Sequence, residues 1–451
     1  MIPYNEFINK KSQLGSDSGF KPLWMPDFLF DFQKHLVEWN TRKGKSATFA
    51  DCGLGKTPMQ LVWAENIVRK TNKKVLIITP LAVSQQTIKE AEKFGIEARR
   101  SRDGKPKGKI TVTNYEQLDK FDSNDYIGAV CDESSILKNF AGATRKGITR
   151  FMVKMPYRLL CTATAAPNDY VELGTSSEAL GQLKHMDMLT QFFRDTSNDK
   201  NPQWSTPKWE LKKHAIKDFW RWVVSWGKAI RRPSDLGFDD GSFLLPELIE
   251  NEHILKITKP LPGELFVKKA RGLREQREER KVTIKERAEA VYNLTKDKKL
   301  SVIWCHYNYE GDYLESSIPK SVQISGKDSD EAKEEKFISF SKGEIPNLII
   351  KPKIGAFGLN WQHCNHMTFF PSHSYEQYYQ GVRRCWRFGQ DKPVVVDIVT
   401  TEGEMGVYNN IKRKSEDADN MFKQMVQLMN NEMKIKPKNH NNTKITLPDW
   451  I

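Results

Sequence analysis

Residues 50–57 combine two glycines, a lysine and a threonine at the spacing of a loop that binds phosphate groups. A short apolar run precedes the loop, and apolar residues recur at helical spacing after it. Gly53 and Gly55 would let backbone N–H groups close around phosphate oxygens at a helix N-terminus. Lys56 would reach the β- and γ-phosphates, and the Thr57 hydroxyl would bind magnesium. The segment therefore predicts a nucleoside triphosphate site.

Two adjacent acids follow a second strand-like run, residues 126–132. In an open α/β sheet, ligands bind at the C-terminal ends of the strands, so this pair would face the same ligand as the glycine-rich loop. Asp132 would hold magnesium, and Glu133 would orient and deprotonate the water that attacks the γ-phosphate. The glycine-rich loop has Ala50 where the strict pattern has glycine, so the acid pair is the second observation that the nucleotide prediction needs. A solvated Asp-Glu turn is the alternative for the pair alone.

Strand-like runs alternate with helical patterns twice along the 451 residues, which indicates two α/β lobes with parallel sheets. The predicted strands are 47–50, 75–79, 110–115, 126–132, 158–164, 302–306, 322–325, 347–351, 366–370 and 394–399. The predicted domains are an N-terminal extension (1–20), a first lobe (21–173), a helical, tryptophan-rich insertion and connector (174–255), a second lobe (256–432) and a disordered basic tail (433–451).

Composition limits the classes of partner. The net charge of +14 favours a polyanionic partner, although a basic surface also serves solubility alone. The six scattered cysteines form no C-x-x-C pair, which indicates a reducing compartment. The sequence has no apolar run of about 18 residues and no signal-peptide pattern. We therefore expect a cytoplasmic protein with no membrane partner.

A third candidate group lies in the second lobe, where Ser374 and Gln377 form a capping-box pattern that predicts a helix. This helix would carry Gln380, Arg383, Arg384 and Arg387. Offsets of four and seven residues place Gln380, Arg384 and Arg387 on one face, with Arg383 about 100° from Arg384. Arginines that reach across a cleft stabilise the transition state of phosphoryl transfer by about 10³ to 10⁵ in rate. A basic surface helix is the alternative.

Residues 380–390 resemble the Q-A-x-x-R-x-x-R-x-G-Q element of the chromatin-remodeller-type (Swi/Snf-like) DNA translocases, a group of superfamily-two helicases. Residues 29–33 resemble the group's L-x-x-Y-Q element, in which the glutamine reads adenine. At Gln33 that role implies ATP. The resemblance implies two RecA-like lobes with ATP and magnesium between them and nucleic acid, chiefly double-stranded DNA, across both. It implies ATP contacts from Gln33, Gly53, Leu54, Gly55, Lys56 and Thr57.

The resemblance covers most of residues 29–400 and suggests further roles. Pro80, Thr113, Asn114, Gly358 and Asn360 fall where the family contacts the nucleic-acid backbone. Loops at strand ends offer N–H groups and hydroxyls to phosphates, although ordinary strand-end loops are the alternative. Thr162 and Thr164 resemble the element that couples hydrolysis to lobe movement.

The chain departs from the family in several places. Ser134 and Ser135 follow the two acids where the family usually has Ala-His, and Ala356 stands where a second glycine is common. No histone-reading or DNA-reading appendage is evident. A minimal motor, such as a phage or mobile-element helicase in a bacterial cytoplasm, therefore fits better than a nucleosome remodeller.

The sequence thus predicts an ATP-dependent DNA helicase or translocase. An RNA-directed helicase is one alternative, and a non-catalytic nucleic-acid clamp is another. The intact Lys56, Asp132, Glu133 and Arg384 argue against the clamp, and the second lobe argues against a P-loop kinase.

Two other segments carry predictions. The tryptophans of residues 204–226 lie among basic residues and would either stack on bases or pack on the first lobe. We predict packing. The charge-dense stretch 274–281 is predicted to be a solvated helix face.

Overall fold

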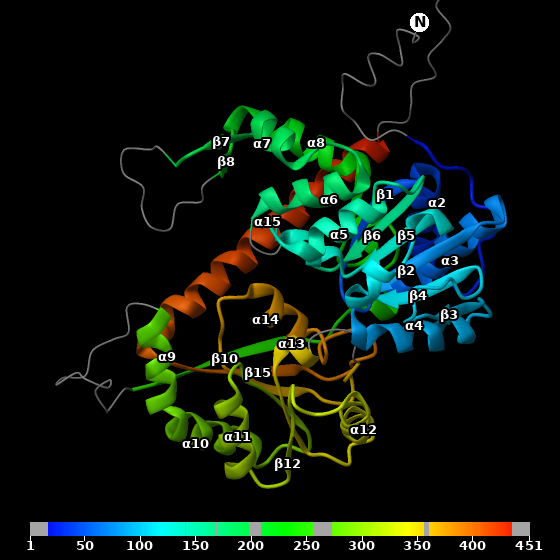
Figure 1. The fold of residues 1–451 in the computed structure, drawn as a ribbon. Helices are drawn as coiled ribbons and strands as arrows, with labels where there is room; N and C mark the ends of the chain where they lie inside the picture. The colour runs from blue at the N-terminus through cyan, green and yellow to red at the C-terminus, as the bar shows by residue number, and fades with distance from the viewer. Residues whose placement is uncertain are drawn as a thin grey trace, which may run out of the picture.

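The computed structural model describes residues 17–139, 141–166, 169–197, 209–256, 273–355 and 360–434. In this part of the chain, two α/β lobes each contain one parallel sheet (Figure 1). The fold class predicted from the alternation of strands and helices is therefore confirmed. All of the predicted strands are present, with small differences at their ends.

The first lobe contains, within the described residues, a seven-stranded parallel sheet of order β3-β4-β2-β5-β6-β1-β9. Its strands are β1 (Lys45–Ala50), β2 (Lys74–Thr79), β3 (Ala98–Arg100), β4 (Ile110–Asn114), β5 (Tyr126–Asp132), β6 (Tyr157–Thr162) and β9 (Gly227–Ile230). Its helices include α2 (Asp31–Lys43), α3 (Lys56–Thr71), α4 (Leu81–Lys93), α5 (Ala143–Met152) and α6 (Leu173–Leu180). The central strands are buried along nearly their whole length, because helices cover both faces of a parallel sheet.

The second lobe contains, among the described residues, a six-stranded parallel sheet of order β10-β15-β14-β11-β13-β12. Its strands are β10 (Leu248–Leu255), β11 (Ser301–Trp304), β12 (Ser321–Ile324), β13 (Asn347–Ile350), β14 (His366–Phe369) and β15 (Val394–Thr401). Its helices include α9 (Leu273–Val282), α10 (Ile284–Thr295), α11 (Asn308–Ser317), α12 (Asp330–Ser341), α13 (Pro352–Gly355) and α14 (Tyr375–Val382).

The region predicted as insertion and connector also supplies an edge strand to each sheet. It contains α7 (His185–Phe192), the antiparallel pair β7 (Phe193–Asp195) and β8 (Trp209–Leu211), and α8 (Ile216–Trp226). After α8 the chain forms β9 beside β1, and it then forms β10 beside β15. The passage from β9 to β10 is therefore the covalent link between the lobes.

The tryptophans of α8 pack into the first lobe. Trp220, Trp222 and Trp226 are buried, and they belong to the same apolar core as β1 and β5. The predicted packing role is thus confirmed for these three side chains, whereas Trp204 lies outside the described residues. Arg221 on the same helix is exposed, so α8 has a buried apolar face and a face in contact with solvent.

We expect Trp222→Ala to lower the free energy of unfolding by about 3–5 kcal/mol, the cost of removing a large buried aromatic side chain. Chemical denaturation followed by circular dichroism would measure the change, with Arg221→Ala as the exposed control on the same helix. Unchanged stability together with lost nucleic-acid binding would instead assign this tryptophan to a binding surface.

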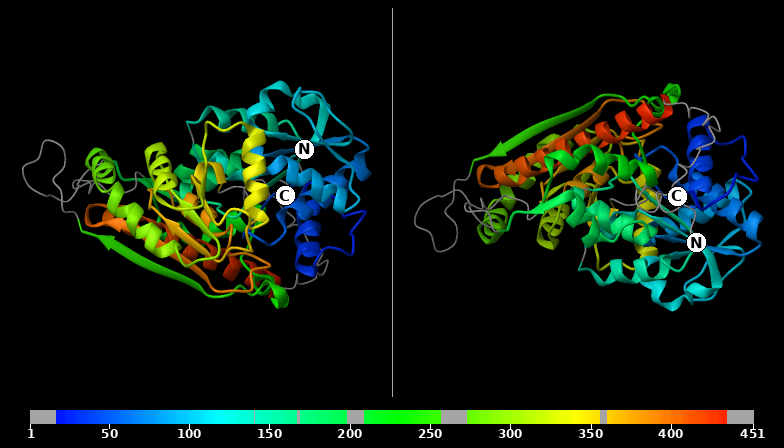
Figure 2. Two further views of the ribbon diagram at one scale, coloured as in Figure 1. Left: turned by 90° about the horizontal axis from the view of Figure 1, so that it is seen from below. Right: turned by 90° about the horizontal axis from the view of Figure 1, so that it is seen from above.

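A long helix that the sequence patterns did not predict, α15 (Met405–Lys434), runs from the second lobe to the first (Figures 1 and 2). Its first part packs on the second lobe through Tyr408 and Ile411. Farther along, Met425 and Met429 enter the core of the first lobe. The helix therefore stabilises one relative position of the lobes. The basic tail predicted from residue 433 lies, beyond Lys434, outside the described residues.

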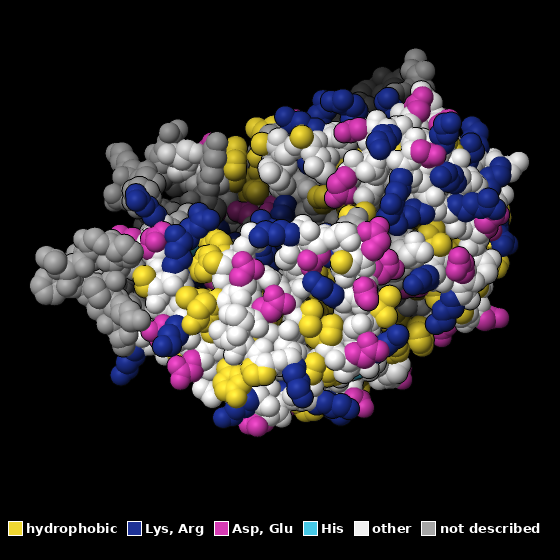
Figure 3. Space-filling model, turned by 60° about the horizontal axis from the view of Figure 1, so that its bottom comes forward, with side chains coloured by type: hydrophobic (Ala, Val, Ile, Leu, Met, Phe, Trp, Pro, Cys, Tyr) yellow, Lys and Arg dark blue, Asp and Glu magenta, His cyan; other side chains and the backbone are white. Residues whose placement is uncertain are grey.

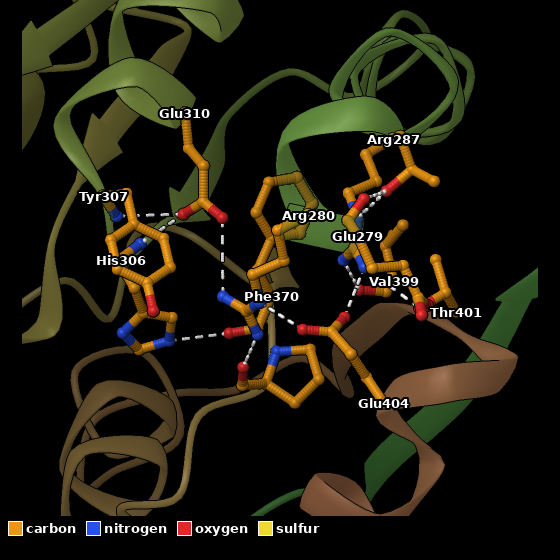
Figure 4. A network of polar contacts seen from close by, with 12 residues as sticks. Glu279, Arg280, Arg287, His306, Tyr307, Glu310, Phe370, Val399, Thr401 and Glu404 are labelled. Atoms are coloured by element: carbon orange, nitrogen blue, oxygen red, sulfur yellow. Dashed lines mark hydrogen bonds and ion pairs between the residues drawn. The ribbon is translucent and has the colours of Figure 1, made fainter. Parts of the chain in front are cut away.

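The charged helix α9 is only in part the solvated face that its composition predicted. Arg274, Glu275, Arg277 and Lys281 are exposed, whereas Glu279 and Arg280, which are drawn in Figure 4, are buried. Arg280 donates to the carboxylates of Glu404 and, over 3.4 Å, of Glu310, and Glu404 also pairs with Arg287. Burial of Arg280 is tolerated because its two carboxylate partners carry the opposite charge. Charge density alone did not reveal these long-range partners.

None of the helices in the described ranges combines the length and the apolar character needed to cross a membrane.

Candidate active site between the lobes

The predicted phosphate-binding loop connects β1 to α3. Gly53 and Gly55 have φ angles of 90° and 74°, a backbone conformation that other residues rarely adopt. The Lys56 ammonium lies back along the loop and donates to the carbonyl oxygens of Ala50, over 3.0 Å, and Asp51, over 3.4 Å. The loop therefore has the strand-to-helix geometry that its sequence predicted, with its lysine beside the loop backbone.

The loop is closely packed on two sides. A Cβ atom on Gly55 would lie 2.3 Å from Nε2 of Gln33, and one on Gly53 would lie 2.9 Å from the backbone nitrogen of Phe388 in the second lobe. Gln33 donates to the Leu54 carbonyl oxygen over 2.9 Å and accepts from the Phe30 backbone N–H over 3.0 Å. The predicted adenine-reading residue thus lies against the phosphate-binding loop.

Asp132 ends β5 and is buried next to the loop. Gln60 of α3 donates to its carboxylate over 2.6 Å. Burial and the neighbouring charge of Glu133 raise the pKa of Asp132 to about 7. A buried carboxylate of this kind fits a cation, which would relieve the cost of its charge. Thr57, the second predicted magnesium ligand, lies at the start of α3.

Glu133 adopts the left-handed backbone conformation, with φ of 52°. Its carboxylate accepts a hydrogen bond from the Thr162 hydroxyl over 3.3 Å. The same hydroxyl oxygen accepts from the Thr164 backbone N–H over 3.1 Å. The structure thus connects the predicted coupling residues to the predicted base.

Helical offsets placed Gln380, Arg384 and Arg387 on one face of a helix, and this placement was wrong for the two arginines because they lie beyond the end of the helix. Ser374 caps α14, accepting from the Gln377 N–H over 3.3 Å as predicted. The helix ends at Val382, and the backbone N–H of Arg384 then donates to the Gly381 carbonyl over 3.1 Å. The arginines therefore lie on a tight turn and not on the helix. The backbone N–H of Trp361 contacts this turn and donates to the Arg384 carbonyl oxygen over 2.9 Å.

Arg383, which the helical offsets directed away from the others, makes the direct ion pair to the loop. Its guanidinium donates to the Asp51 carboxylate and, over 3.1 Å, to the Cys52 carbonyl oxygen. Tyr379 also donates to Asp51. Burial alone would lower the pKa of Arg383, but the Asp51 charge raises it above its usual value. Asp51 lies in the predicted loop at a position to which the pattern gave no role, and no pattern marked Tyr379.

Gln380, Arg384 and Arg387 are brought to the same loop. Arg384 donates to the side-chain oxygen of Gln380 over 3.0 Å, and its guanidinium lies 3.8 Å from the Cys52 sulfur. Burial and the charge of Arg384 lower the pKa of Arg387 to about 10. These guanidinium groups repel one another, so an anion such as a triphosphate would stabilise the cluster.

A cavity of about 960 Å³ lies between the lobes, next to Glu133. Basic side chains from both lobes line it: Lys89, Arg100, Arg102, Lys138, Lys333, Lys342 and Lys353. They outnumber the acidic lining residues, which are Glu116, Glu133, Glu334 and Glu376. The cavity is therefore suited to a long polyanion.

The residues predicted to contact nucleic acid are not all at this cavity. Pro80 lines it, and Asn114 is buried directly before Tyr115, which also lines it. Thr113 is buried, and its hydroxyl donates to the Ser101 carbonyl over 3.0 Å. Asn360 is exposed, and Gly358 lies outside the described residues.

Residues 285–389, which include Gln380, Arg384 and Arg387, match the family model of the helicase conserved C-terminal domain. The matched residues all lie within the second lobe. This match supports the resemblance to superfamily-two helicases that the motifs predicted. In the second lobe, the matched segment runs from α10 to the turn after the arginines.

Among solved structures, a Sulfolobus solfataricus SWI2/SNF2 ATPase core in complex with dsDNA is similar to this chain, with 16% identity and a TM-score of 0.42. The likeness covers 92% of this chain and 98% of that one. None of the curated proteins matches this chain.

Proposed function

We propose that the protein is an ATP-dependent DNA translocase of the Swi/Snf-like group, in which hydrolysis between the lobes drives movement along nucleic acid. One observation carries the proposal. Arg383 and Arg384 of the helicase lobe contact the loop that holds Lys56, so chemistry-bearing residues of both lobes converge on one site. Residues 380–390 carry the motif that favours this group.

Each residue has a task in hydrolysis. Lys56 would exchange its contacts with loop carbonyls for phosphate oxygens. Glu133 would accept a proton from the attacking water, and Arg384 would stabilise the charge that develops on the γ-phosphate. Asp132 and Thr57 would hold magnesium, which supplies charge neutralisation when bound. Hydrolysis would yield ADP and phosphate, and release of the phosphate would remove the negative charge that the arginines stabilise.

The contacts of Glu133 and Lys138 suggest how ATP hydrolysis would change the contacts of the protein with nucleic acid. Glu133 both accepts from Thr162 and lines the cavity between the lobes. Lys138, which lines the same cavity, pairs with Glu376 of α14, the helix that leads to the arginines. A change at the γ-phosphate would therefore alter contacts on both sides of the cavity.

Steady-state ATP hydrolysis by the wild type and Lys56→Ala tests the proposal, with duplex DNA, single-stranded DNA, RNA or no nucleic acid present. We expect duplex DNA to stimulate the wild type most and Lys56→Ala to lose hydrolysis, because the lysine contacts the reacting phosphates. Lys73→Ala, at an exposed lysine of the same lobe, is the control.

Selective stimulation by RNA would instead indicate an RNA-directed helicase. Binding of nucleic acid without hydrolysis by the wild type would indicate a non-catalytic clamp.

A further inference from the structure

A basic segment outside the helicase motifs connects β3 to β4. Residues 99–109, named here the basic ledge, contain six basic residues and one acidic residue. The basic residues are Arg99, Arg100, Arg102, Lys105, Lys107 and Lys109. The ledge thus concentrates positive charge in a short stretch of a chain whose net charge is +14.

The basic ledge continues the cavity between the lobes. Arg100 and Arg102 line that cavity, and with Asp103 and Lys107 they also line a second hollow of about 350 Å³. β3 is the edge strand of the first sheet, and it lies beside α4 (Figure 1), whose Lys89 lines the cavity. A polyanion that leaves the cavity at this edge would therefore meet the ledge.

The ledge is held in a defined shape by hydrogen bonds. Asp103 accepts from the Ser101 hydroxyl over 2.7 Å and from the Lys105 N–H over 3.2 Å, which lower the pKa of this carboxyl to about 2. Thr113 donates to the Ser101 carbonyl over 3.0 Å. The only acid of the ledge thus serves to form its turn. A preformed loop loses less conformational entropy when it binds.

The charge of the ledge is available at the surface. Arg102 is exposed, and the Lys107 side chain keeps 45% of its surface accessible although it lies 3.5 Å from Asp103. Over the face drawn in Figure 3, basic and acidic side chains are interspersed. A local excess of exposed guanidinium and ammonium groups fits the regularly spaced phosphates of a nucleic-acid backbone.

We propose that the basic ledge binds backbone phosphates of the nucleic acid where it leaves the cavity between the lobes. This inference rests on the proposed function and adds a contact surface to it. Arg102 and Lys107 are its principal phosphate-binding residues. Because they read phosphates and not base edges, the contact is independent of sequence.

The test compares the wild type with Arg102→Ala/Lys107→Ala in binding to duplex DNA that extends well beyond the cavity, over a range of salt concentrations. Loss of two phosphate contacts reduces the slope of log affinity against log salt by about 2. The thermal melting temperature should stay at the wild-type value. Arg102→Lys/Lys107→Arg, which keeps both charges, should retain the wild-type slope.

Lys285→Ala/Lys298→Ala removes two exposed charges from the second lobe and is the matched control. If the wild type binds DNA and the ledge variant has the wild-type salt slope, the ledge proposal is wrong while the proposed function stands. That result would also be expected if the ledge bound an acidic protein. If the wild type binds no nucleic acid, the proposed function itself fails.

Discussion

Arg384→Ala is expected to lower the turnover number for ATP hydrolysis by about 10³-fold or more, with a smaller effect on ATP binding. The guanidinium lies 3.8 Å from the Cys52 sulfur in the phosphate-binding loop, at the position from which it would meet the transferred phosphoryl group. An arginine in that place contributes about 10³ to 10⁵ to the rate because it stabilises charge that is greatest in the transition state. Single-turnover hydrolysis with saturating ATP would measure the loss.

Two further variants separate catalysis from structure. Arg384→Lys keeps the charge but lacks the planar guanidinium group. That group donates to Gln380 and would at the same time donate to a phosphate, so we expect the lysine variant to recover only part of the rate. Arg413→Ala, at a side chain that is 61% exposed on α15, should retain the wild-type rate. A turnover number within a few-fold of the wild type for Arg384→Ala would remove this residue from the catalytic site.

Glu133→Gln is expected to lower the turnover number by about 10² to 10⁴-fold, because an amide does not accept the proton of the attacking water. ATP binding should be retained, since the substitution preserves the shape of the side chain. Fluorescent-nucleotide titration would measure binding, and quenched-flow hydrolysis would measure the chemical step.

Thr162→Val is the companion variant. It removes the hydroxyl that donates to Glu133 over 3.3 Å but leaves the base itself. We expect a smaller loss of hydrolysis together with weaker stimulation by DNA, because this hydroxyl also accepts from Thr164 in the predicted coupling element. Equal stimulation by DNA in the wild type and Thr162→Val would exclude a coupling role for the hydroxyl.

Local patterns predicted the elements that carry the chemistry. The strand before Asp132 and the loop before Lys56 were identified because continuous apolar runs and glycine spacing act over a few residues. The edge strands β3, β9 and β10 were missed. They are short or half-exposed, so their sequences lack the apolar runs of central strands.

The placement of the arginines shows why part of the site was not predictable. Helical offsets assume that the helix continues, but α14 ends at Val382. Arg383 therefore faces Asp51, more than three hundred residues away in the chain. Likewise, the charge pattern of α9 gave no sign of the buried pairing between Arg280 and Glu404.

The sequence by itself determined the two parallel sheets, the glycine-rich loop between a strand and a helix, and the identity of the acids and arginines proposed to act on a triphosphate, since these depend on local periodicity and on side-chain chemistry. Only the tertiary structure decided which arginine pairs with Asp51, that α15 joins both lobes, and that the basic ledge continues the cavity between them. Such contacts form between segments distant in the chain, and their free energy depends on packing and burial that no local pattern records.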